Sequence, residues 1–143
     1  MGVVRSLYTN NNTATITLAS LADNATAVSS AINNSSTKFI NLDIQLRYRT
    51  TTGTSSLGAV TIFLVRSVDG GTTYDDSPTN ADAIGVFAAN TDSTTFTVST
   101  DTALSGQLPD FFKIAVKNSS GAAFDSTGSN FFLKYNGKQF EVT

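Results

Sequence analysis

The chain has 143 residues, a net charge of −2 and only 14% charged side chains, and it contains no histidine, cysteine or tryptophan. Without histidine and cysteine, it lacks the side chains that most often supply acid–base, nucleophilic and soft-metal chemistry. The slight acidic excess argues against nucleic-acid binding, which depends on Lys and Arg at the phosphates. No apolar run approaches the roughly 20 residues that span a bilayer. The length is that of one domain, and Ser, Thr and Asn give it a polar, weakly charged surface suited to lateral packing.

The first twelve residues have a composition of their own. Four apolar residues stand out in this segment: Val3, Val4, Leu7 and Tyr8. The run of three asparagines at 10–12 follows them. An apolar leader on a polar hinge can dock on a partner or on a neighbouring copy; alternatively, it pairs as an edge strand of its own domain. We divide the chain into an N-terminal arm, residues 1–12, and a single β-sandwich domain, residues 13–143, with the four apolar residues as candidates for partner binding.

Apolar residues then alternate with polar ones in short runs, the pattern of half-buried strands. Residues 13–19 form the first run, whereas the alanine-rich segment 21–34 is predicted to contain a helical turn or more. The clearest strand is 38–50, where Leu42 to Tyr48 alternate with polar residues, so we expect one buried and one solvated face. Residues 59–67 carry apolar side chains on both faces, which predicts a central strand covered on both sides.

The second half of the chain continues in the same pattern. The predicted strands are 84–88, 94–99, 111–117, 130–135 and 138–142. Between the last two runs stands Asn136-Gly137, a strong signal for a two-residue hairpin turn. Seven or eight short strands separated by turn residues predict an all-β, antiparallel sandwich. We favour a jelly roll over an immunoglobulin-like sandwich because the cysteine pair and the core tryptophan of the latter are absent.

One local motif resembles a known structural turn. Residues 67–74, Ser-Val-Asp-Gly-Gly-Thr-Thr-Tyr, are similar to the Asp box of sialidase-type propellers, with Tyr74 in place of the usual tryptophan. In that family the box is a structural hairpin rather than a catalytic site. We therefore expect the Asp69 carboxylate to accept hydrogen bonds across a turn in which glycines allow positive φ.

The acidic residues offer few candidate sites. Calcium-type oxygen ligands gather in one loop: Asp69, Asp75, Asp76, Asn80 and Asp82. Their spacing is not that of an EF-hand, so we favour a solvated loop over a metal site. Asp43 stands in mid-strand, where we expect it to pair with an arginine across the sheet. No carboxylate pair stands out as acid and base, so we expect neither an enzyme nor a cofactor. The Asn-x-Ser/Thr triplets, at Asn34 and Asn118 among others, are interpreted as a by-product of composition.

Taken whole, the chain resembles the small β-rich structural proteins of tailed-phage virions. The similar segments are 4–8, 16–21, 67–74, 108–110, 116–122 and 134–137. The resemblance implies a protein that decorates and cements the capsid by binding between coat subunits. Its partners would be the major capsid protein and further copies of itself, with no nucleic acid and no membrane. It would be made in the cytoplasm of the host bacterium and located on the virion surface. A tail or neck protein, or a receptor-binding module that recognises carbohydrate, is the alternative.

Overall fold

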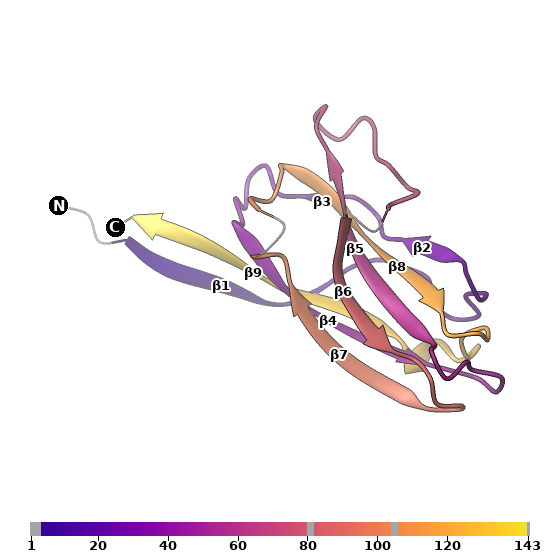
Figure 1. Ribbon diagram of the computed structural model, residues 1–143. Helices are drawn as coiled ribbons and strands as arrows, with labels where there is room; N and C mark the ends of the chain where they lie inside the picture. The colour runs from indigo at the N-terminus through magenta and orange to yellow at the C-terminus, as the bar shows by residue number, and fades with distance from the viewer. Residues whose placement is uncertain (1–3, 80–81, 104–105, 143) are drawn as a thin grey trace.

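The computed structural model describes residues 4–79, 82–103 and 106–142, and these form two antiparallel β-sheets packed face to face (Figure 1). The first sheet contains, in spatial order, β1 (Val4–Thr13), β9 (Phe132–Val142), β4 (Asn41–Arg49) and β7 (Thr95–Asp101). The second contains β2 (Thr26–Val28), β8 (Phe111–Ser119), β5 (Ala59–Ser67) and β6 (Ala83–Ala88), with β3 (Ile32–Asn33) also paired to β8. A short 3-10 helix, η3 (Gly128–Asn130), precedes β9. None of the described residues forms a helix able to cross a membrane.

The strand order is that of a jelly roll. If β2 and β3 are taken as one interrupted strand, the chain folds as nested antiparallel pairs: β1 with β9, β2 and β3 with β8, β4 with β7, and β5 with β6. Wrapping these pairs around each other places β9 beside β4 and β8 beside β5, which completes the two sheets. The predicted all-β sandwich is confirmed, and its order is the jelly roll rather than the immunoglobulin-like arrangement.

The core lies between the sheets, and β4 shows how the sequence builds it. Leu42, Ile44, Leu46 and Tyr48 point inward and are at most 1% exposed, while the residues between them face outward. The predicted alternation along this strand is confirmed. Successive side chains of a strand point to opposite faces of the sheet, so every second residue of β4 is buried and the residues between them face solvent.

β5 is covered on both faces, as predicted. Its inward residues join the main core, whereas Phe63 and Val65 on the other face are 2% exposed. They pack with Ala115 of β8 and with Tyr74 from the loop that follows β5. A second small cluster therefore holds that loop against the outer face of the sheet.

Two predictions near the N-terminus are wrong. Residues 14–18 keep the predicted alternation of burial but belong to no strand, because they cross from one sheet to the other. Ala14 donates its N–H to Leu133 of the first sheet, while the carbonyl of Thr15 accepts from Ser30 beside the second. Segment 21–34 contains β2 and β3 instead of a helix, since its backbone hydrogen bonds go to β8.

The predicted hairpin turn at Asn136-Gly137 is also wrong. β9 runs through both residues without a turn, and Gly137 lies opposite Thr9 of β1 and Leu42 of β4. A Cβ at Gly137 would collide with the ring of Phe39, which is 6% exposed. Glycine is needed here so that the ring can pack against the backbone of β9, and not for a turn.

Candidate functional site

The predicted partner-binding segment lies at the edge of the first sheet. Val3 lies outside the described residues, while Val4, Leu7 and Tyr8 belong to β1, opposite Val142, Gln139 and Lys138 of β9. The structure therefore shows the second of the two alternatives for the arm, an edge strand of its own sandwich. An edge strand can still contact another molecule, and the position of this one in the fold shows which surface it offers.

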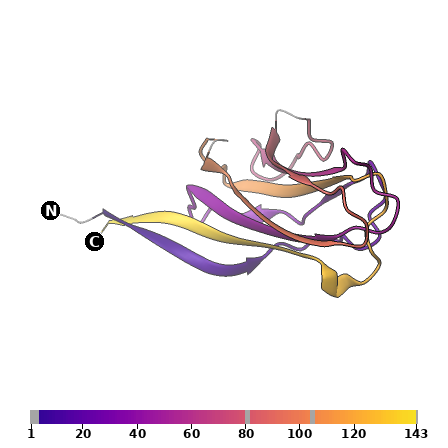
Figure 2. The ribbon, with the colours of Figure 1, turned by 60° about the horizontal axis from the view of Figure 1, so that its bottom comes forward.

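β1 and β9 continue together past the rest of the sheet. Pairing between β4 and β9 ends at Asn41 and Lys138, so residues 139–142 pair only with residues 4–7. We call these two segments the terminal ribbon; Figure 1 and Figure 2 show it extending away from the sandwich, with both chain ends at its tip. Phe140 on this ribbon is 58% exposed. A two-stranded ribbon with one exposed aromatic and open edges offers backbone and apolar surface to a second protein.

A β-bulge separates the ribbon from the body of the sheet. Thr9 pairs with Gly137 and Asn12 pairs with Tyr135, so two residues of β1 lie opposite Asn136 alone. Asn11 adopts a left-handed φ of 61°, which asparagine tolerates better than most residues, and its N–H donates to Asn136 Oδ1 at 3.0 Å. The asparagine run predicted as a hinge is thus a bulge, which bends the strand and sets the direction of the ribbon.

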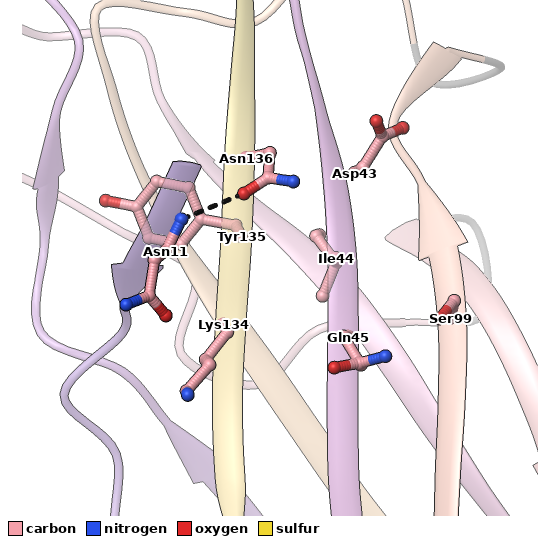
Figure 3. A pocket seen from close by; sticks show the side chains of 8 residues that line it. All are labelled: Asn11, Asp43, Ile44, Gln45, Ser99, Lys134, Tyr135 and Asn136. Carbon is pink, nitrogen blue, oxygen red and sulfur yellow. Dashed lines mark hydrogen bonds between the residues drawn. The ribbon is translucent and has the colours of Figure 1, made fainter. Parts of the chain in front are cut away.

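A depression of about 450 Å³ lies on the outer face of the first sheet beside this bulge. Its polar lining comes from β1, β4, β7 and β9: Asn11, Asp43, Gln45, Ser99, Lys134 and Asn136. Figure 3 shows these side chains next to one another on adjacent strands. We call this site the sheet-face depression.

Among the residues that the structure describes, most polar side chains of the sheet-face depression have no hydrogen-bond partner. In the described part of the chain, the hydrogen bond from Asn11 to Asn136 is the one between lining residues (Figure 3). No other described residue hydrogen-bonds to the side chains of Asp43, Gln45 or Ser99. Lys134 lies with its ammonium 5.1 Å from the centre of the Phe132 ring. The site therefore presents unused donors and acceptors to solvent.

The predicted ion pair of Asp43 with an arginine is wrong. Asp43 lies opposite Asp101 of β7 and Asn136 of β9. Within the described part of the chain, no ion pair joins it to an arginine. The register, which the sequence does not reveal, places a second carboxylate across from it instead of a cation.

The Asp-box-like segment forms the predicted turn. Asp69 Oδ1 accepts from Thr73 N at 2.9 Å, from Ser67 Oγ at 2.8 Å and from Thr72 N at 3.1 Å. Gly70 and Gly71 have φ values of 73° and 87°. These hydrogen bonds, above all those from Thr73 and Ser67, lower the pKa of Asp69 to about 2. The carboxylate is thus used to fold the loop through its Oδ1 atom, which is the structural role expected for an Asp box.

We expect the substitution Asp69→Asn to destabilise the protein at neutral pH but not in acid. The pKa of Asp69 in the folded protein, about 2, is below its ordinary value of 3.8. The ionised carboxylate therefore stabilises the fold above about pH 4, and this contribution disappears as the pH falls towards 2. Melting temperatures of both proteins at pH 7 and at pH 2 test this. An equal difference at the two pH values would contradict the assignment.

The candidate calcium ligands do not converge. Asp76 pairs with Lys113 at 3.0 Å, Asp75 accepts from Ser77 N, and Asp82 accepts from Thr79 N. Asn80 lies outside the described residues. Among the residues that the structure describes, no three acidic side chains group as metal ligands would. These contacts are those of a hydrogen-bonded surface loop.

Comparison with known proteins identifies no family. No family model matches the chain, and no curated protein matches it. Among solved structures, it is similar to part of a mutant Xylanase10C from Cellvibrio japonicus in complex with xylopentaose. The TM-score is 0.44 at 15% identity, over 97% of this chain and 28% of that one. A structure of infectious bursal disease virus, Gx strain, matches with a TM-score of 0.24 at 12% identity, over 99% of this chain and 40% of that one. Both likenesses are too weak to support a function.

Proposed function

We propose that this protein is a structural component of a tailed-phage virion that decorates the capsid and stabilises it by binding between coat subunits. The observation that carries the proposal is the terminal ribbon, which leaves the sandwich with Phe140 exposed and its outer edges unpaired by the described residues. The resemblance of the sequence to virion proteins supplies the context in which such a ribbon would act.

The ribbon suits the contact that such a role requires. Its backbone can extend a sheet of a coat subunit by strand addition, because the N–H and C=O groups along its edges are not paired by a third strand. Phe140 would fill an apolar pocket of the coat protein, as aromatic anchors do in protein interfaces. Because binding would occur only on the assembled shell, it would raise the free energy needed to separate the subunits. The weakly charged surface would let neighbouring copies pack closely.

We expect Phe140→Lys to weaken binding to capsids by about thirtyfold or more, the loss typical of an aromatic hot spot. The measurement is co-sedimentation of the purified protein with capsids of the phage that encodes it, prepared without this protein. Phe140 is 58% exposed, so the fold should be unaffected. Val86→Lys on β6 is the matched control, since Val86 is 65% exposed but distant in the fold from the ribbon.

Equal binding of the Phe140→Lys variant and the wild-type protein would overturn the role of the ribbon. Absence of the protein from gradient-purified virions would overturn the virion assignment itself. Quantitative mass spectrometry of such particles also separates the two virion roles. A copy number comparable to that of the major capsid protein supports decoration, whereas a small fraction of it would indicate the tail, the neck or a receptor-binding tip.

A further inference from the structure

The sheet-face depression has a regular arrangement of side chains. Cross-strand pairing places Asn136 and Asp43 in one row, which Asp101 continues outside the lining, and the next outward row contains Lys134, Gln45 and Ser99. Neighbouring strands lie about 4.8 Å apart, so each row is a line of closely spaced polar groups. Amides and hydroxyls provide both donors and acceptors, carboxylates provide acceptors, and the ammonium provides donors.

The charges in the lining do not favour an ionic ligand. The lining has one carboxylate, Asp43, and one ammonium, Lys134, so its formal charges cancel and it offers no net attraction to an anion or to a cation. The contact of the Lys134 ammonium with the Phe132 ring, at 5.1 Å from its centre, favours this position of the charge. A neutral ligand with many hydroxyls, each both donor and acceptor, uses all of these groups without repulsion.

The shape of the site favours a ligand that extends beyond it. The volume of about 450 Å³ is within the range of small-molecule sites. Asn11, Asp43, Gln45 and Ser99 are all exposed, so the depression is open to solvent and does not enclose what it holds. An open site on a sheet face allows an extended chain to lie across the strands.

From these observations we propose that the sheet-face depression binds a neutral oligosaccharide, with Asp43, Gln45 and Asn136 hydrogen-bonding to its hydroxyl groups. This inference is independent of capsid decoration, because it concerns the face of the sheet and not the terminal ribbon. On a virion surface, such a site would hold the particle near glycan-bearing surfaces.

The test is binding of the labelled full-length protein to an array of immobilised glycans. The array carries neutral oligosaccharides of glucose, galactose, mannose and xylose, together with sialylated and sulfated glycans. We expect binding to neutral glycans and none to the charged ones. A wild-type protein that binds no glycan on the array, or that prefers the sialylated or sulfated ones, would overturn the proposal.

Variants then assign the binding to the site. Asp43→Ala should weaken binding to the best glycan about tenfold, the usual loss for a hydrogen bond to a charged group, and Gln45→Ala about fivefold, the usual loss for a neutral one. Thr97→Ala is the control, since Thr97 is exposed on the same face two residues from Ser99 but outside the depression. Its affinity should stay within twofold of the wild type. Undiminished binding by both site variants would overturn the assignment.

The two proposals fail separately. Phe140→Lys should lose capsid binding and keep glycan binding, whereas Gln45→Ala should show the reverse. Both side chains are exposed, so circular dichroism should show the same fold for the two variants.

Discussion

Replacing Tyr48 with alanine is expected to lower the free energy of unfolding by about 5 kcal/mol, comparable to the entire stability of many domains. Tyr48 is fully buried, and its ring stacks between Phe96 and Phe124, at centroid distances of 5.1 and 5.7 Å. Its hydroxyl donates to the carbonyl of Ala88 at 2.5 Å. Truncation would leave a cavity in the aromatic layer between the sheets and an unpaired carbonyl at the end of β6.

The variant Tyr48→Phe separates these two losses. It keeps the ring and removes only the hydroxyl, so we expect a loss of about 1–2 kcal/mol. Urea unfolding at neutral pH measures both variants, with Phe140→Ala as the control for an exposed aromatic, expected within about 0.5 kcal/mol of the wild type. A Tyr48→Ala variant as stable as Tyr48→Phe would show that the ring packing contributes little. Burial also raises the pKa of Tyr48, so the hydroxyl stays protonated and remains a donor at any pH used.

The sequence predicted the fold well wherever the local pattern and the tertiary environment agree. Along β4, alternation of apolar and polar residues specifies both the strand and its buried face, because a sheet with one face in the core and the other in solvent imposes the same period of two. β5 was predicted as doubly covered for the same reason, from Phe63 and Val65 on its second face. The turn at Asp69 was predicted because its hydrogen bonds are local.

The wrong predictions arise where a sequence pattern suggests a local structure but is in fact required by a contact with a distant part of the chain. Asn136-Gly137 has the composition of a hairpin turn, but Gly137 is small because the Phe39 ring lies on it. Residues 14–18 alternate as a strand would, but their backbone bonds first to Leu133 of β9 and then to Ser30, between β2 and β3. The residue type shows that a side chain must be small or must point inward, but it does not show which neighbouring residue requires this.

The sheet-face depression could not be found from the sequence. Asp43 and Gln45 were recognisable as the solvated side of one strand, but Ser99, Lys134 and Asn136 come from β7 and β9, far away in the chain. Only the order of the strands in the sheet brings these residues to one site. The pairing register between distant strands cannot be read from the sequence of any single strand. The terminal ribbon could not be predicted for a related reason: it exists because β9 continues beyond the point where its pairing with β4 ends.

Asn118 is the clearest case of a residue whose importance only the structure reveals, and Asn118→Ala is expected to cost about 3 kcal/mol. Asn118 is fully buried in β8. Its Nδ2 donates to Leu21 O at 3.0 Å and to Ala122 O at 2.8 Å, while Oδ1 accepts from Ser120 N at 3.0 Å. One side chain thereby joins two loops to the end of a strand. Alanine would leave the buried N–H of Ser120 without its acceptor. It would also remove one of the two hydrogen bonds to each of the carbonyls of Leu21 and Ala122, which also accept from Phe124 N and Ser120 Oγ.

The isosteric variant Asn118→Asp tests whether these donors are responsible. It preserves the shape and the acceptor for Ser120 N but turns the two donors into a carboxylate oxygen facing two carbonyls. We therefore expect a larger loss than for alanine, since repulsion and desolvation of a buried charge add to the lost hydrogen bonds. Urea unfolding at pH 7 compares both with Asn90→Ala, at an exposed asparagine where a change within about 0.5 kcal/mol is expected. If Asn118→Asp proved as stable as the wild type, the hydrogen bonds from Nδ2 would not be what holds these loops. The Asn-x-Ser triplet at 118–120 would then have no explanation beyond the high content of Asn and Ser in the chain.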